Sequence, residues 1–159
     1  MKTVLARLAA LVLGSAPAAA EDVSATLYRG NGSLPPPYHR SLRAEISADG
    51  RVRLRACRGY DDNDVACRTL TGKADPAALK SIEAAARAEG LPERPLSANP
   101  NPPVGGGSTS ATVVLDGQVL IVPPFPAEAD ARRAEAVVSA ILGAIPAQTM
   151  AAANAALAD

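Results

Sequence analysis

Apolar and polar residues alternate strictly on both sides of Gly50, across residues 41–57, and this pattern constrains the fold more than any other feature. Such alternation predicts two antiparallel strands with one buried face. A two-residue turn would place Ile46 opposite Arg53 and would mix apolar and charged side chains on both faces. A three-residue loop instead pairs Ile46 with Val52 and keeps one face wholly apolar. We therefore predict a hairpin in this second register.

The other elements follow from capping residues and spacing. Asp75 and Pro76 are a typical N-cap and first helical residue, and Gly90 is placed to end the helix, so we predict a helix over 76–89. Apolar residues at helical spacing predict a second helix, stopped by Pro146. The remaining expected elements are a strand at 24–29, a loop at 95–110, a second hairpin at 111–122 with a central place in the sheet, the second helix at 127–144, and an unassigned Ala-rich tail at 147–159.

These elements predict one α+β domain over residues 21–146. We expect an antiparallel sheet of two hairpins plus a short N-terminal strand, with two helices packed on one face. The expected core consists of large apolar residues from the hairpins and helices: Leu42, Ile46, Val52, Leu54, Leu79, Ile82, Val113, Val137, Val138, Ile141 and Leu142.

Residues 1–20 have the order of parts that a secretory signal requires. Lys2 and Arg7 precede a short apolar stretch, and Ala18-Ala19-Ala20 offers a small-residue cleavage site. The stretch is too short to cross ~30 Å of hydrocarbon, and no later segment approaches the ~20 apolar residues of a spanning helix. We expect an exported protein, periplasmic or secreted, that is soluble after cleavage.

The charge balance excludes two classes of protein. Without the expected signal the chain keeps 14 basic residues against 16 acidic ones. A strongly basic nucleic-acid binder and an acidic disordered tail are both excluded by this near-neutral composition.

Cys57 and Cys67 are the only cysteines. An oxidising compartment favours their pairing, and the nine residues between them match neither a C-x-x-C redox motif nor a zinc site. We predict a structural disulfide.

No catalytic or metal-binding pattern stands out. His39 is the only histidine, and no G-x-S-x-G context identifies a nucleophile for it. The Asp-Asp-Asn-Asp run at 61–64 offers oxygens for calcium, but Val65 or Ala66 falls where an EF-hand needs its third ligand. The Gly/Ser run at 105–110 lacks the lysine of a phosphate loop and leads into a strand, which indicates a linker. We predict a non-enzyme with no metal and no cofactor.

Two groups of residues are candidates for binding a partner. The Pro-rich loop is expected to display Leu34, Tyr38 and His39, and its prolines lower the cost of ordering it. The polar face of the first hairpin suits an acidic protein, anionic lipid or cell-wall polymer, although a solvated face is the simpler interpretation. Its basic residues are Arg43, Arg51, Arg53 and Arg55, with Arg58 just beyond.

The order of elements resembles a known family. Across residues 24–145, the chain is similar to emfourin-type domains in the order of its elements. These are a first strand followed by Arg29-Gly30-Asn31-Gly32, a hairpin, a helix ending near Leu91-Pro92, a second hairpin and a closing helix. These are small bacterial inhibitors of thermolysin-like metalloproteases. The signal, the disulfide loop, the Pro-rich insertion and the lack of an Asp before the second hairpin depart from that pattern, so no inhibitory residue is carried over.

The resemblance implies a protease as partner. The leading hypothesis is an exported non-catalytic binding module with a protein partner, and the resemblance raises protease inhibition as its activity. The alternative is an envelope structural protein attached through its arginine-rich sheet face.

Overall fold

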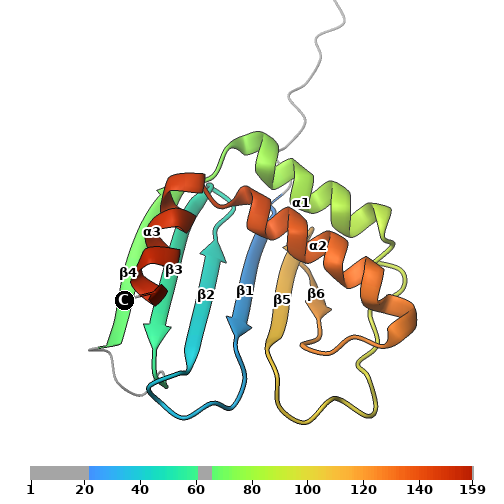
Figure 1. Ribbon diagram of the computed structural model, residues 1–159. Coiled ribbons are helices and arrows are strands. Elements are labelled where there is room, and N and C mark those ends of the chain that lie inside the picture. Colours follow the sequence, from blue (N-terminus) through green and yellow to red (C-terminus); the bar gives the residue numbers. More distant parts are fainter. Residues whose placement is uncertain (1–21, 61–65, 159) are drawn as a thin grey trace, which may run out of the picture.

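An antiparallel six-stranded sheet in the order β4-β3-β2-β1-β5-β6 forms the frame of the protein (Figure 1). The computed structural model describes residues 22–60 and 66–158. The strands are β1 (Ser24–Gly30), β2 (Arg40–Ile46), β3 (Arg51–Arg58), β4 (Cys67–Lys73), β5 (Ser108–Leu115) and β6 (Gln118–Val122). The helices are α1 (Pro76–Ala88), a 3-10 turn η2 (Glu128–Asp130), α2 (Ala131–Ala144) and α3 (Ala147–Ala158).

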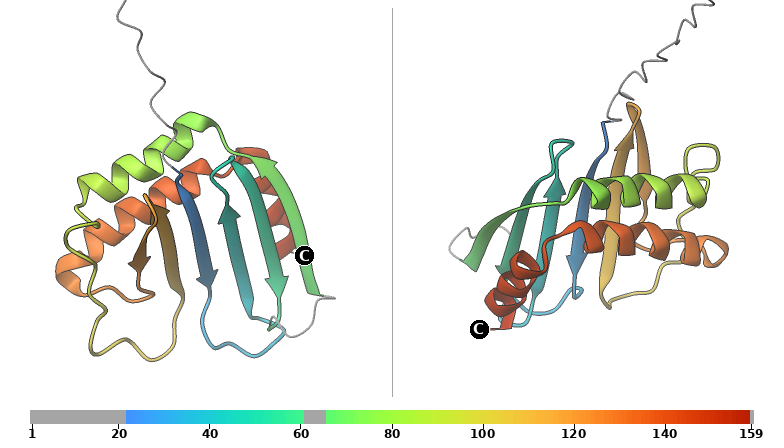
Figure 2. Two further views of the ribbon diagram at one scale, coloured as in Figure 1. Left: turned by 180° about the vertical axis from the view of Figure 1, so that it is seen from behind. Right: turned by 90° about the horizontal axis from the view of Figure 1, so that it is seen from above.

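The predicted α+β class and antiparallel sheet are confirmed. Figure 2 shows the three α-helices on the same side of the sheet, and no described helix covers the other side, which we call the uncovered side. Burial follows this division, because large fully buried strand side chains such as Leu27, Leu54 and Val113 lie on the helix side. Of the expected core, Leu79, Val138 and Leu142 are only partly buried and lie at its margin.

Both predicted hairpins are present. In the first, β2 pairs with β3 so that Ile46 faces Val52, and Gly50 has the left-handed φ of 80° that the three-residue loop requires. In the second, β5 and β6 are joined by Asp116 and Gly117, which have φ values of 52° and 76°. Two successive positive φ values are typical of the tight turn that an Asp-Gly pair favours.

Strand β1 lies between the two hairpins and joins them into one sheet. Leu27 faces Ala44 of β2 on one side and Ala111 of β5 on the other. The prediction that the second hairpin is central is therefore wrong, because β6 is an edge strand. Its apolar composition misled the prediction: Val119 and Ile121 face the uncovered side and are 60% and 62% exposed.

Strand β4 was not predicted. It pairs with β3 along its length, and the pair begins at the disulfide between Cys57 and Cys67, which face each other across the two strands. The predicted disulfide is thus present. Apart from the half-buried Leu70, the strand carries mostly polar, exposed residues. It therefore has no apolar alternation that could have indicated a strand.

Helix α3 is the Ala-rich tail, and it packs against β3 and β4. Ala153 is completely buried, and Met150 and Leu157 pack against the core. Gly72 of β4 permits this close approach, since a Cβ there would lie 2.6 Å from Thr149 Oγ1. Pro146 sets the direction of the helix, because the residue before a proline favours an extended backbone. The two C-terminal helical segments accordingly meet at an angle of 100°.

Helix α1 begins as predicted, with the Asp75 side chain accepting a hydrogen bond from Ala77 N at 2.7 Å. Helix α2 begins at Ala131, later than the predicted residue 127. The preceding residues form η2, at whose end Asp130 accepts hydrogen bonds from Ser97 N and from Arg133.

A buried arginine, Arg133, connects helices α1 and α2. The side chain of Arg133 is 4% exposed and donates to Glu89 O, Arg94 O and Asp130 Oδ1, at distances between 2.6 and 2.8 Å. Glu89 is the C-cap of α1, so a cation there also meets the negative end of the helix dipole.

Within residues 22–60 and 66–158, no single helix is long and apolar enough to cross a membrane; only the bent pair Glu128–Ala144 and Ala147–Ala158, taken together, reaches that length and composition. The expected signal at 1–20 and the acidic run at 61–64 lie outside the described residues.

Candidate partner-binding end of the sheet

Four large, exposed apolar side chains lie where two long loops meet the sheet. One loop joins β1 to β2, and the other leads into β5 at the lower end of the sheet in Figure 1. The exposed fractions are 41% for Leu34, 67% for Tyr38, 43% for Tyr60 and 105% for Val104. We call these four residues the loop end.

The loop between β1 and β2 is held closed by Asn31. Its Nδ2 donates to Tyr38 O at 2.9 Å and its Oδ1 accepts from Arg40 N at 2.8 Å. The Asn31 amide at the start of the loop therefore forms hydrogen bonds with two backbone groups at its end, and these bonds hold the two ends together. Within the loop, Pro35 O accepts hydrogen bonds from the backbone N–H groups of Tyr38 and His39. These bonds, with three successive prolines, reduce the conformational freedom of the loop.

Tyr60 ties the loop to the end of β3. Its hydroxyl donates to Leu34 O at 2.7 Å, and its ring stacks on the His39 ring with centroids 4.4 Å apart. His39 is only 6% exposed, and its Nδ1 lies 2.8 Å from Gly59 O. Because a carbonyl can only accept, Nδ1 carries the proton of this bond. His39 is thus a buried support for Tyr60, whereas the sequence analysis expected it to be displayed.

The β1–β2 loop and the loop before β5 contact each other at two glycines, Gly32 and Gly106. A Cβ on Gly32, whose φ is 94°, would lie 2.3 Å from Gly106 O, so only glycine permits this crossing. The Gly-rich segment predicted to be a linker therefore passes close to the Pro-rich loop. This contact brings Val104 to the same end of the sheet as Leu34.

The predicted arginine face is separate from the loop end. By alternation, Arg43, Arg51, Arg53 and Arg55 lie on the uncovered side of the sheet, which faces the viewer in the left panel of Figure 2. Arg58, which the sequence analysis grouped with these arginines as a candidate for binding a partner, follows Ala56 in the alternation and lies on the opposite side of the sheet.

Carboxylates neutralise part of the arginine face. Arg51 Nε lies 2.7 Å from Asp49, and Arg53 lies 3.7 Å from Glu45. The Arg51 backbone N–H donates to the Asp49 carboxylate and, with the nearby cations, holds the pKa of Asp49 below its ordinary value. Arg43 has no such partner among the described residues. The face is accordingly basic, but less so than its sequence suggests.

The exposure expected for Leu34 and Tyr38 is observed, whereas the exposed Tyr60 and Val104 were not predicted. Tyr60 follows Cys57 closely in the sequence, and the disulfide anchors the end of β3. This nearness to the cysteine is the sequence signal that could have indicated Tyr60.

Among the described residues, no group of three or more His, Cys, Asp or Glu side chains could hold a metal ion. Comparison with protein-family models and with curated proteins found no match to this sequence.

Proposed function

We propose that the protein is an exported, non-catalytic binding module that docks on a partner protein through the loop end. The observation that supports this most directly is the combination of exposed apolar side chains with a loop whose backbone is already fixed by Asn31 and Tyr60. A loop of this kind loses little conformational entropy on binding, so its contacts contribute more fully to affinity.

The partner that we propose is a thermolysin-like metalloprotease, following the resemblance to emfourin-type inhibitors. A rigid projecting loop suits insertion into a protease cleft, and Tyr38 is the kind of aromatic anchor that dominates many interfaces. In this proposal Asn31, His39 and Tyr60 fix the shape of the loop, while Leu34 and Tyr38 make the contact.

Inhibition of a purified thermolysin-like metalloprotease by the mature protein tests this function. We expect inhibition by the wild type and an inhibition constant at least about thirtyfold higher for a double variant, Leu34→Ala with Tyr38→Ala, because truncating a central anchor costs ~2 kcal/mol or more. Both residues are exposed, so the unfolding temperature should not change.

The matched control is Val119→Ala with Ile121→Ala, which removes two exposed apolar side chains from β6. It should inhibit as the wild type does. Equal inhibition by the loop variant and the wild type would refute the role of the loop, and no inhibition by the wild type would refute the protease as partner.

A second candidate function is attachment to an anionic envelope polymer through the arginine face. The observation that favours it is the gathering of four arginines on the uncovered side of the sheet, including Arg43, which has no carboxylate partner among the described residues. Electrostatic attachment should weaken sharply as salt rises, whereas an apolar loop complex should persist. A salt titration of binding to isolated envelope therefore separates the two functions.

Export is also part of the proposal, and intact-protein mass spectrometry of the secreted and envelope fractions tests it. We expect an N-terminus near Glu21 and a mass two hydrogens lower than that of the reduced chain, because an oxidising compartment preserves the disulfide. Recovery of the full-length chain with two free thiols would contradict both expectations.

A further inference from the structure

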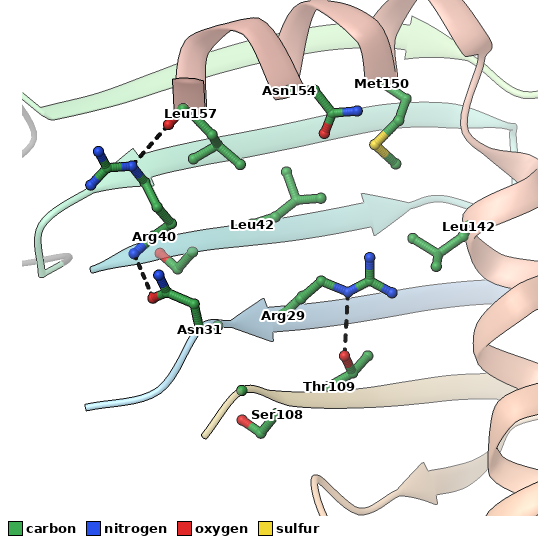
Figure 3. A pocket seen from close by; sticks show the side chains of 13 residues that line it. Arg29, Asn31, Arg40, Leu42, Ser108, Thr109, Leu142, Met150, Asn154 and Leu157 are labelled. Atoms are coloured by element: carbon green, nitrogen blue, oxygen red, sulfur yellow. Dashed lines mark hydrogen bonds between the residues drawn. The ribbon is translucent and has the colours of Figure 1, made fainter. Parts of the chain in front are cut away.

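A hollow of about 620 Å³ lies on the helix side of the sheet, inside the angle between α2 and α3 (Figure 3). Helix α3 turns away at Pro146 to cover β3 and β4, while α2 lies over the other half of the sheet. The end of β1 and the start of β2 are therefore left as an uncovered floor. The volume falls within the ~300–1,000 Å³ of small-molecule sites.

The walls of the hollow are largely apolar. Leu42 projects from the floor, Leu142 from α2, and Met150 and Leu157 from α3. Leu42 belongs to the buried core, and the other three pack against it. An apolar ligand chain in the hollow would therefore extend the core rather than form a contact separate from it.

Arg29 is one of two arginines that line this apolar hollow. Arg29 follows Ala25 and Leu27 in the alternation of β1, so it lies on the helix side of the sheet, the same side as these two buried core residues. Its Nε donates to Thr109 Oγ1 at 3.3 Å, and it forms no ion pair with any described residue. The rest of its guanidinium group is available to an anion.

The other arginine of the hollow is already engaged. Arg40 donates to the carbonyl oxygens of Pro37, His39 and Leu157, each at 2.8 or 2.9 Å. It closes the C-terminal end of α3 and contributes structure rather than a free charge. The two arginines therefore have different roles, and only Arg29 offers an anchor.

We propose that the hollow binds a free amphipathic carboxylate, with its hydrocarbon chain against Leu42, Leu142 and Met150 and its carboxylate on Arg29. An apolar cavity with one convergent charged group is the usual design of a site for such a ligand. A planar guanidinium pairs with a carboxylate through parallel hydrogen bonds, which fixes the orientation of the ligand. This site is distinct from the loop end and does not depend on a protein partner.

Binding of decanoate and of 1-decanol to the purified mature protein tests the proposal, with calorimetry as the measurement. We expect saturable binding of decanoate below its micelle concentration. Replacing Arg29 with Gln should raise the Kd of decanoate by roughly fivefold, the effect of losing a partly exposed ion pair, and should leave the Kd of decanol unchanged. The control Arg43→Gln removes an arginine from the other side of the sheet and should change neither Kd.

A second variant tests the location. Asn154 lines the hollow and is exposed, so Asn154→Trp should fill the space without lowering the unfolding temperature, and it should abolish binding of both ligands. Undiminished binding to this variant would overturn the proposal. So would equal decanoate affinity for the wild type and Arg29→Gln, absence of decanoate binding, or binding only to anionic phospholipid vesicles.

Discussion

Replacing Ile141 with Ala should lower the free energy of unfolding by about 2–5 kcal/mol, as truncation of a large core side chain does. Ile141 of α2 is completely buried in the layer between helices and sheet. The helix layer and the sheet are each held in place by other contacts, so the space left by the side chain cannot close fully. The remaining cavity therefore adds to the free energy lost with the buried apolar surface. The measurement is equilibrium unfolding in urea, followed by circular dichroism.

Ile121→Ala is the matched control. It removes the same side chain from β6, where Ile121 is 62% exposed on the uncovered side, and should change the free energy by less than about 0.5 kcal/mol. A small change for Ile141→Ala would contradict the packing of α2 on the sheet. A large change for Ile121→Ala would show that something covers β6.

Arg133→Met should have an effect of similar size, a loss of about 3 kcal/mol, because it leaves buried carbonyl oxygens without donors. Arg133 donates to Glu89 O and Arg94 O, and so connects the end of α1, the following loop and the start of α2. Methionine keeps an unbranched apolar stem of similar length, so the variant removes chiefly the donors. Neighbouring Arg132, whose side chain is 80% exposed, is the control.

Arg132→Met should change the free energy of unfolding by less than about 0.5 kcal/mol, although it also removes an ion pair, with Glu89. Equal effects of the two substitutions would refute the connecting role of Arg133.

The difference between wild type and Arg133→Met should also depend on pH. Hydrogen bonds from Ser97 N and then from Arg133 hold the pKa of Asp130 below its ordinary value of 3.8. A carboxyl group with a lowered pKa stabilises the folded state above that ordinary value, and this contribution is lost as the pH falls through the folded pKa. The difference should therefore be constant near neutral pH and should shrink in acid, below about pH 4.

The hairpins show what local pattern can predict. In the first, the requirement for one wholly apolar face was sufficient to select the pairing of Ile46 with Val52. In the second, the Asp116-Gly117 dipeptide located the turn. Both signals act over a few residues, where side-chain alternation and turn geometry determine the register directly.

The elements that escaped prediction depend on distant partners. Strand β4 has little apolar alternation and is held by β3 and the disulfide, and α3 buries small side chains that carry no helical stripe. The close approach at Gly72 is a tertiary contact with Thr149, which lies 77 positions later in the chain. No local window contains that information, and the edge position of β6 escaped for the same reason.

The candidate site was half predictable. Leu34 and Tyr38 follow from a Pro-rich loop, because prolines exclude helix and keep such a segment at the surface. The burial of His39 and the contribution of Val104 depend on how three separate segments meet at one end of the sheet. Sequence alone placed these segments in the chain but not beside one another.

The central position of β1 has a consequence for the order of folding. This strand is the first element of the sheet, but its second partner lies far along the chain: Arg29 and Thr109 are 80 residues apart. Local hairpins can form early, whereas closing so long a loop is a slow, entropically costly step that topology imposes. Until β5 arrives, one edge of β1 presents unpaired backbone groups to other chains. The pairing of β1 with β5, near the middle of the sheet, is therefore the last to form. A chain that is not yet fully synthesised or fully exported keeps an open strand edge on β1.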